Sequence, residues 1–331
     1  MPMCRVYKCE HATPMNSSII IPVYNRVSDL LSILKQLKEQ ACREFEVVVV
    51  DDGSTTPVTS AVQCAHYPYS LRIVRHEHRR GIAAARNTGI VTAREQHLIF
   101  VDSDADLLDS HWLEKHHNAY ERAGAMARSA GHSHFVFHST VKGIAATFAG
   151  RVDTYANWWG SDLKTAHIVR DRHVPMNNTS MHRDVFDRVG MFDEAFAVSE
   201  DIEWGFRCMA CGVIAVFMPG APVGHHDRDS VRKVWEHYYR FGQYSPKVRT
   251  RHPGGPWRWL YPGNRRQAIL RFLPLTVLKT VYIVWKCFPQ SPGVVLYAPG
   301  IYLANVASFM GMYKTLAAGP DEKGLSSKSG S

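Results

Sequence analysis

Cysteine is scarce in this chain of 331 residues, which has only seven scattered cysteines. Small secreted domains that depend on disulfides have densely spaced, usually even-numbered cysteines, so this set does not indicate a disulfide framework. The first 18 residues also lack the long apolar run of a secretion signal. Both absences predict a protein that works in the reducing environment of the cytoplasm.

The sequence also lacks a glycine-rich phosphate-binding loop after its first apolar segment. Dinucleotide oxidoreductases carry G-x-G-x-x-G at this place, and sugar nucleotidylyltransferases carry a loop such as G-x-G-T-R. Here the residues are Pro22-Val-Tyr-Asn25. The sequence therefore disfavours both classes of enzyme, of which the nucleotidylyltransferase stays the lesser alternative.

Acidic residues are few in the last third of the chain. Residues 231–331 contain 15 Lys/Arg and 3 Asp/Glu, whereas residues 1–230 contain 24 and 27. The protein therefore has a mildly acidic body and a basic C-terminal region, which suits a partner rich in phosphate. A hydrophobic content of 45% excludes a disordered or fibrous chain.

Short apolar runs alternate with amphipathic or alanine-rich segments over about the first 120 residues, the pattern of an α/β sheet. We expect buried parallel strands at 17–22, 45–50, 71–74 and 97–101. We expect helices at 30–38 and 81–94. The predicted fold class is α/β, with a Rossmann-like, mostly parallel central sheet flanked by helices.

Two of these strands end in acidic turns, Asp51-Asp52 and Asp102-Ser103-Asp104. The carboxyl ends of the strands in an open α/β sheet form the ligand crevice, so these turns should converge. Carboxylates gathered there repel one another unless a cation offsets them, and Mg²⁺ or Mn²⁺ suits such oxygen ligands and substrate phosphates. For either turn alone, capping of the next helix is an open alternative.

Seven motifs, in order along the chain, resemble those of family 2 glycosyltransferases of the GT-A fold. Four resemble the nucleotide-sugar half: SIIIPVYN at 18–25, VDDGS at 50–54, GIAAARNTG at 81–89 and FVDSD at 100–104. Three resemble the acceptor half: NTSMHRDVF at 178–186, GMFDE at 190–194 and SEDIE at 199–203. The resemblance implies an inverting enzyme that moves a sugar from a nucleotide-diphosphate sugar to an acceptor hydroxyl.

The resemblance assigns the first two motifs to the nucleotide. It implies that Pro22, Tyr24 and Asn25 line the nucleotide pocket. It also implies that Asp51 accepts a hydrogen bond from the base, with Asp52 beside it as a second substrate-binding residue.

The resemblance assigns the next motifs to the diphosphate and a divalent metal, Mn²⁺ or Mg²⁺. It implies that Arg86 supplies positive charge or an ion pair near the nucleotide. Asp102 and Ser103 would contact the donor, and Asp102 would also reach the metal. Asp104 would ligate the metal, and His225, in a His-His-Asp sequence, could return a further ligand.

An inverting transfer needs a base on the face of the sugar opposite the leaving diphosphate. Glu200 and Asp201 are the candidates, and adjacent residues at a helix start point about 100° apart, so only one can face the reacting carbon. By resemblance we assign the base to Asp201, leave Glu200 to bind acceptor or cap the helix, and place Asn178 near the sugars. An ordinary acidic helix start is the alternative.

The C-terminal region combines basic, aromatic and apolar residues. Segment 268–288 has only three charges, Arg271, Lys279 and Lys286, which share one side of a helical wheel and leave a broad apolar face. Residues 287–313 carry no charge but are interrupted by prolines and glycines, so we expect a re-entrant or surface-lying helical pair. This pattern favours an anionic membrane surface over nucleic acid.

Membrane attachment would place the protein, peripheral or integral, at the inner face of the membrane, with a lipid-linked or cell-surface glycan as acceptor. The alternative is a helical hairpin packed on the catalytic body or on a second protomer, as in a homodimer. A non-catalytic scaffold that binds membrane or nucleic acid is a further alternative, against which Asp102, Asp104 and Asp201 argue together.

The predicted organisation has four parts. An N-terminal extension at 1–16 precedes a catalytic domain at 17–230, whose nucleotide-sugar half is 17–124 and whose acceptor half is 125–230. A basic, hydrophobic helical region follows at 231–318 and a disordered tail rich in Gly, Ser and Lys at 319–331.

Overall fold

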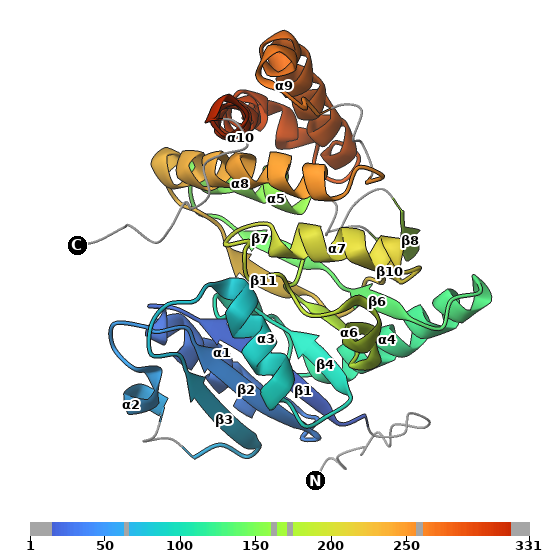
Figure 1. Ribbon diagram of the computed structural model, residues 1–331. Coiled ribbons are helices and arrows are strands. Elements are labelled where there is room, and N and C mark those ends of the chain that lie inside the picture. Colours follow the sequence, from blue (N-terminus) through green and yellow to red (C-terminus); the bar gives the residue numbers. More distant parts are fainter. Residues whose placement is uncertain (1–14, 63–65, 160–163, 171–174, 256–260, 319–331) are drawn as a thin grey trace.

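The computed structural model describes residues 15–62, 66–159, 164–170, 175–255 and 261–318 (Figure 1). The expected strands of the first half are present as β1 (Ser17–Val23), β2 (Phe45–Asp51), β3 (Ser70–Arg75) and β4 (His97–Phe100). They pair in parallel in the order β3-β2-β1-β4. β1, β2 and β4 are buried along their whole length, as expected of strands covered on both faces.

The sheet extends further along the chain than the sequence predicted. Its eight strands follow the order β3-β2-β1-β4-β9-β6-β10-β8. The added strands are β6 (Phe135–His138), β8 (His167–Val169), β9 (Thr179–His182) and β10 (Ile214–Phe217). β9 is antiparallel to β4 and β6, and β8 to β10, so the sheet is mostly parallel with two reversed strands. These added strands are short, which leaves little periodicity for a sequence pattern to reveal.

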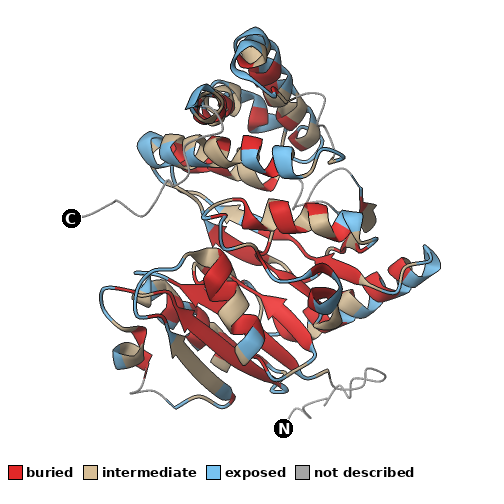
Figure 2. Cartoon of the chain, viewed as in Figure 1, coloured by how far each residue is buried: buried red, intermediate tan, exposed pale blue. Residues whose placement is uncertain are grey.

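Two hydrophobic cores cover the two faces of the sheet. Ile19, Ile21 and their neighbours pack with α1 (Val27–Lys38) and the start of α4 (Trp112–Ser129). Ile20 and Phe100 point the other way, toward α3 (Ile82–Thr92), α6 (Asp184–Val189) and α7 (Glu200–Ala210). Figure 2 shows the buried strands between these helices, and the short α2 (Val58–Val62) follows β2. The expected helices at 30–38 and 81–94 are confirmed as α1 and α3.

Helix α3 lies unusually close to β1, and a glycine makes this approach possible. A Cβ atom at Gly89 would lie 2.3 Å from Cγ2 of Ile20, closer than any real contact. Any side chain at position 89 would therefore push α3 away from the sheet. The close packing fixes Arg86, one turn earlier in the same helix, near the carboxyl end of the strands.

A second, three-stranded sheet lies beside the carboxyl ends of the main sheet. It has the order β5-β11-β7, with β5 (Ala105–Leu107), β7 (Val141–Ile144) and β11 (Val223–His226). The antiparallel register of β5 and β11 pairs Ala105 with His225. This pairing brings His225 next to Asp104, although the two are far apart in the sequence.

Helices from the C-terminal region cover this end of the molecule (Figure 1). They are α8 (Val231–Arg251), α9 (Arg265–Cys287), the 3₁₀ helix η1 (Pro292–Tyr297) and α10 (Ala298–Ala318), which pack with α5 (Phe148–Trp158). α8 and α10 are in direct backbone contact at two glycines. A Cβ atom at Gly242 would lie 1.8 Å from the carbonyl oxygen of Ser308, and a Cβ atom at Gly311 would lie 2.0 Å from the carbonyl oxygen of Tyr239. Such contact tolerates only glycine.

The charge-free segment 287–313 is less broken than its composition predicts. Pro289 and Pro292 lie in and after the turn that follows α9. Pro299 lies in the first turn of α10, where the missing N–H costs no helical hydrogen bond. The segment therefore forms the turn and most of the second arm of a helical hairpin.

The hairpin leaves much of its apolar surface exposed. Segments 265–287 and 292–318 are long and apolar enough to cross a membrane, yet only 28% and 33% of their apolar windows are buried. The largest exposed apolar side chains of α9 are Ile269, Leu270, Leu273, Leu278, Val281 and Trp285. Core helices of soluble proteins bury such side chains, so this surface indicates a partner. Residues 1–14 and 319–331, which hold most of the expected N-terminal extension and the expected tail, lie outside the described residues.

Candidate active site

A cavity of about 450 Å³ lies between the carboxyl ends of the strands and the C-terminal helices. The catalytic body contributes Arg86, Asp102, Asn177, Ser199, Glu200, Asp201 and His225 to its lining. The C-terminal helices and the segment between them contribute His237, Tyr238, Phe241, Arg249, Tyr261 and Lys279. Candidates from three distant parts of the sequence, near residues 102, 201 and 225, therefore share one cavity.

Asp102, Asp104 and His225 form the one cluster among the described residues that could hold a metal ion. One ligand atom from each lies within 4.8 Å of the others. The Nε2 atom of His225 is 3.8 Å from Oδ1 of Asp104. Two carboxylates and an imidazole are a donor set that divalent cations accept, so the residues fit the expected metal.

His225 is oriented by a carboxylate behind it. Its Nδ1 atom lies 3.3 Å from Oδ1 of Asp227. Asp227 also accepts hydrogen bonds from Trp158 Nε1 at 3.0 Å, through Oδ1, and from Thr154 Oγ1, through Oδ2. A carboxylate behind a histidine fixes the tautomer that presents the other nitrogen to a metal. Burial lowers the pKa of His225, but Asp227 and the carboxylates of Asp104 and Asp102 outweigh it, so the pKa is raised. The Trp158 ring packs on His225, which assigns Trp158 a packing role.

The other oxygen of Asp104 is bound by a residue that the sequence analysis missed. Arg26 Nη1 lies 2.5 Å from Oδ2 of Asp104, and the Arg26 side chain is 51% exposed. Arg26 directly follows the Pro22–Asn25 motif, and this proximity was the only signal that pointed to it. Because an exposed ion pair is weak, it can yield to a ligand at small cost.

Arg86 connects the two acidic groups of the cavity. Its guanidinium forms ion pairs with Glu200 through Nη1 and with Asp102 through Nη2, the second at 3.2 Å. Both Arg86 and Glu200 are buried. Arg86 therefore forms ion pairs within the protein, and the expected roles of Arg86 near the nucleotide and of Glu200 at the acceptor stay predictions.

The acidic groups around Arg86 hold protons more tightly than usual. Burial raises the pKa of Glu200 to about 7, and the neighbouring Asp201 adds to this shift while Arg86 opposes it. Burial also raises the pKa of Asp201 and of Asp102, again against the effect of Arg86. Asp201 is only half-buried and lines the cavity, and its Oδ1 accepts a hydrogen bond from the N–H of Ile202 at 2.8 Å.

The residue before α7 has a strained backbone, and buried polar atoms near it lack partners. Ser199 has a left-handed conformation with φ of 68°, which costs a non-glycine residue about 1 kcal/mol or more. The buried polar atoms Ser199 Oγ, Asn177 Nδ2 and Arg86 Nε also have no hydrogen-bond partner in the described part of the chain. An unpaired buried polar group costs about 1–3 kcal/mol, so three of them around one cavity indicate a polar ligand.

The acidic turn after β2 is occupied by protein donors. Asp51 is fully buried and accepts hydrogen bonds from Ser54 N, Val58 N and Arg75 Nη1. Burial raises its pKa, but the hydrogen bonds from Ser54 and the others outweigh burial and lower it.

Asp52 likewise has no free carboxylate oxygen. It accepts hydrogen bonds from Arg80 N and Gly81 N at 2.8 Å each, and it pairs with His76. Asp52 therefore fixes the start of α3, and its expected contact with substrate stays a prediction.

The expected nucleotide residues after β1 differ in accessibility. Pro22 is buried within the strand, whereas Tyr24 is exposed and stacks under the Arg79 guanidinium at 4.4 Å. Asn25 adopts a φ of 53°, and its side-chain oxygen accepts a hydrogen bond from Thr55 N at 2.8 Å. Tyr24 and Asn25 can therefore meet a ligand through their side chains, whereas Pro22 is buried.

Asn178 is not available to a substrate. It is fully buried, and its amide donates hydrogen bonds to the carbonyls of Thr140 and Ala221, both at 2.8 Å. Its neighbour Asn177 lines the cavity instead, because Asn178 takes a φ of 60° and turns its own side chain inward. Ser103, between the two candidate metal ligands, is buried.

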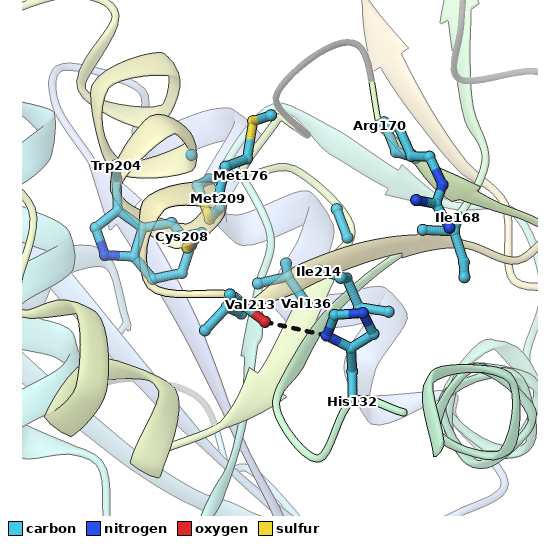
Figure 3. A pocket seen from close by; sticks show the side chains of 14 residues that line it. His132, Val136, Ile168, Arg170, Met176, Trp204, Cys208, Met209, Val213 and Ile214 are labelled. Carbon is cyan, nitrogen blue, oxygen red and sulfur yellow. Dashed lines mark hydrogen bonds between the residues drawn. The ribbon is translucent and has the colours of Figure 1, made fainter. Parts of the chain in front are cut away.

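A second pocket of about 280 Å³ lies on the other side of α7 (Figure 3). It is lined mainly by apolar side chains such as Met176, Trp204 and Met209, and none of its lining residues is acidic. His132 hydrogen-bonds to the Gly212 carbonyl at 3.2 Å. This pocket therefore lacks the carboxylates that the larger cavity contains.

Comparison with known proteins supports a family 2 glycosyltransferase. Residues 18–143 match the family described as Glycosyl transferase family 2. The glycosyltransferase AglE of Haloferax volcanii is 26% identical over 230 residues, which are 68% of this chain and 71% of AglE. This chain is also 39% identical over 108 residues to YfnE of Bacillus subtilis, an uncharacterized glycosyltransferase.

The overlap with relatives varies. A pre-mycofactocin glycosyltransferase of Mycobacterium tuberculosis is 27% identical over 252 residues, which are 71% of this chain and 48% of that protein. The match to YfnE spans 32% of this chain and 27% of YfnE. This chain therefore spans less than two thirds of the length of both of these relatives.

A solved structure supports the fold. The mannosyltransferase PcManGT from Pyrobaculum calidifontis, determined with GDP-Man and Mn²⁺, aligns with a TM-score of 0.58 and 17% identity. The alignment covers 95% of this chain and 92% of that one. The GT-A fold expected from the sequence is confirmed.

The buried Arg86–Glu200 pair yields a prediction for Glu200→Gln. A carboxyl whose pKa rises from 4.5 to about 7 on folding stabilises the protein below pH 4.5, and this contribution is lost as the pH rises through 7. Gln cannot titrate, so the variant does not lose this contribution as the pH rises. Between pH 5 and 8 the free energy of unfolding should therefore fall less steeply in the variant than in the wild type, and the two slopes should differ by up to about 1.4 kcal/mol per pH unit. Denaturant unfolding at several pH values measures it.

Glu194→Gln is the matched control, because Glu194 is exposed and pairs with Arg80 at 3.0 Å. Its pH profile should match that of the wild type. An unchanged slope in Glu200→Gln would contradict the raised pKa.

Proposed function

We propose that this chain is a metal-dependent, inverting glycosyltransferase that moves a sugar from a nucleotide-diphosphate sugar to an acceptor hydroxyl. The observation that carries the proposal is the cavity that Asp102, His225 and Asp201 line together, with Asp104 in one cluster with Asp102 and His225. A leaving diphosphate needs positive charge, and an attacking hydroxyl needs a base. The cluster would hold the cation that supplies the positive charge, and Asp201 would be the base.

The donor would bind with its diphosphate beside Asp102, Asp104 and His225, and with its nucleoside toward Tyr24 and Asn25. The two carboxylates and the imidazole of these residues would hold Mn²⁺ or Mg²⁺. When bound, the ion supplies positive charge that offsets the negative charge developing on the leaving diphosphate. The complex of PcManGT with GDP-Man and Mn²⁺ supports a donor and a metal of this kind.

Asp201 would act as the base. Its carboxylate takes the proton from the acceptor hydroxyl as the oxygen attacks the anomeric carbon, and the bond to the diphosphate breaks on the opposite face. The Arg86–Glu200 pair acts as a positioning element, because Glu200 fixes the guanidinium that also holds Asp102. The non-catalytic scaffold is disfavoured, since a scaffold has no need of three unpaired buried polar atoms around the cavity.

We also assign the parts of the chain. Residues 17–230 would form the catalytic domain, with the donor half at 17–124 and the acceptor half at 125–230. Residues 231–318 would attach the enzyme to the inner face of an anionic membrane, because α9 exposes a row of large apolar side chains and the region is basic.

Asp201→Asn should lower the rate of sugar transfer by roughly 100-fold or more, because the amide cannot accept the proton. Binding of the nucleotide sugar should stay within about twofold, measured by calorimetry in the presence of Mn²⁺. Asp229→Asn is the matched control, since Asp229 is exposed and pairs with Lys233. Wild-type transfer by the Asp201 variant would place the base elsewhere.

Removal of divalent metal with EDTA should abolish transfer, and Mn²⁺ or Mg²⁺ should restore it. Asp104→Asn should weaken Mn²⁺ binding roughly tenfold or more, read directly by electron paramagnetic resonance of free Mn²⁺. Asp109→Asn, at an exposed ion pair with Lys115, should bind Mn²⁺ as the wild type does. Full activity after thorough chelation would remove the metal from the mechanism.

Replacement of Leu270 and Leu278 on α9 by Asp should release the protein from vesicles that contain phosphatidylglycerol. Each exposed leucine that enters the membrane contributes about 1.5–3 kcal/mol, so the double variant should lose well over tenfold in affinity. Val91→Asp is the control, because Val91 is 72% exposed but lies on α3 of the body. Equal cosedimentation of all three proteins would contradict membrane attachment.

A further inference from the structure

Each carboxylate of the candidate metal cluster pairs with one arginine, and the two arginines differ in exposure. Asp102 pairs with Arg86 at 3.2 Å, and the Arg86 side chain is 6% exposed. Asp104 pairs with Arg26 at 2.5 Å, and the Arg26 side chain is 51% exposed. A buried guanidinium cannot leave its carboxylates without a large cost, whereas an exposed one can return to water. Arg86 is therefore a fixed partner of the cluster, and Arg26 is an exchangeable one.

The Arg26 ion pair competes with a cation for the charge of Asp104. Oδ2 of Asp104 binds Arg26, while Oδ1 lies 3.8 Å from His225 Nε2. A divalent cation at the cluster and a guanidinium on the same carboxylate would lie close together and repel each other. Repulsion from a doubly charged ion at this range exceeds what an exposed ion pair contributes. We therefore expect Arg26 to leave Asp104 when a divalent cation binds.

A second carboxylate gives Arg26 support when it leaves. Its Nη1 atom also lies 3.3 Å from Oδ2 of Asp29, three residues later in α1, whose side chain is 39% exposed. A guanidinium that moves away from Asp104 can thus keep one carboxylate partner on its own helix. This lowers the cost of the movement.

The backbone of Arg26 is fixed beside the loop that is expected to meet the nucleotide. The preceding residue, Asn25, donates its N–H to Ser54 Oγ at 2.9 Å. The carbonyl of Arg26 accepts a hydrogen bond from Leu30 N at 3.0 Å, in the first turn of α1. The main chain is held on both sides while the side chain is exposed. The guanidinium can therefore turn from Asp104 toward a ligand of this loop without a change in the backbone.

We propose that Arg26 exchanges Asp104 for a phosphate of the donor nucleotide when a divalent cation binds the Asp102–Asp104–His225 cluster. This inference rests on the proposed function, since it presumes the metal site and a diphosphate donor. Phosphate oxygens accept two parallel hydrogen bonds from a guanidinium, so the diphosphate is a strong partner for the released side chain. Arg26 thereby opposes binding of the metal alone and favours binding of metal and nucleotide together.

Binding of Mn²⁺ alone to the full chain tests the first half of the exchange. Arg26→Gln should bind Mn²⁺ about two- to fivefold more tightly than the wild type, because no guanidinium has to leave Asp104. Electron paramagnetic resonance of free Mn²⁺ measures it, in about 0.15 M salt that screens charges farther away than about 8 Å. A merely structural role of Arg26 would give weaker binding in the variant, not tighter binding.

Two further variants serve as controls for the charge. Arg26→Lys keeps the positive charge and should bind Mn²⁺ as the wild type does. Arg232→Gln removes an arginine that is 87% exposed and pairs with Glu236 at 2.8 Å on α8. It should also leave Mn²⁺ binding unchanged, because no residue of the metal cluster is its partner in that pair.

Binding of GDP and UDP at saturating Mn²⁺ tests the second half. The nucleotide that the wild type binds more tightly should bind Arg26→Gln roughly tenfold more weakly, measured by calorimetry, because a charge-assisted contact to phosphate is lost. Arg232→Gln should bind it as the wild type does.

Equal or weaker Mn²⁺ binding by Arg26→Gln would overturn the exchange, and equal nucleotide binding would overturn the contact with phosphate. The proposed metal site fails in a different way, namely if Asp104→Asn binds Mn²⁺ as the wild type does. The role of Arg26 alone fails if Asp104→Asn weakens Mn²⁺ binding while Arg26→Gln leaves it unchanged. The two failures are therefore distinguishable.

Discussion

The architecture depends on how carboxylates that repel one another are kept close together. Asp102 and Asp104 lie on one segment and Glu200 and Asp201 on another, and burial raises the pKa of Asp102, Glu200 and Asp201 because it makes their negative charge costly. Arg86 offsets part of this charge by binding Glu200 and Asp102 at once. A buried guanidinium keeps its proton under all ordinary conditions, so it serves as a permanent counter-charge. The remaining charge faces the cavity, where a cation and a diphosphate donor would balance it.

Secondary structure brings these groups together at one edge of the sheet. The parallel strands end at one edge of the sheet, which delivers the acidic turns and the start of α3. The small β5-β11-β7 sheet returns His225 to the same edge. Strained conformations at Asn25, Asn178 and Ser199 occur where the chain enters or leaves these elements.

The C-terminal helices contribute to the lining of the cavity and change its character. They add basic and aromatic side chains, among them Arg249, Lys279 and Phe241, to a lining that also contains carboxylates of the body. Basic residues of α8 and α9 thereby have a place at the cavity.

The sequence alone determined the first four strands, two helices and the residues of the acidic turns, because buried parallel strands are long apolar runs and strand ends in such sheets converge. It could not separate Asp51 and Asp52, which bind the protein's own backbone, from Asp102 and Asp104, since all four follow strands. It chose Asn178 over Asn177 because only backbone conformation decides which side chain turns inward. It missed Arg26, which pairs with Asp104. Those roles arise from contacts between distant segments, which only tertiary packing specifies.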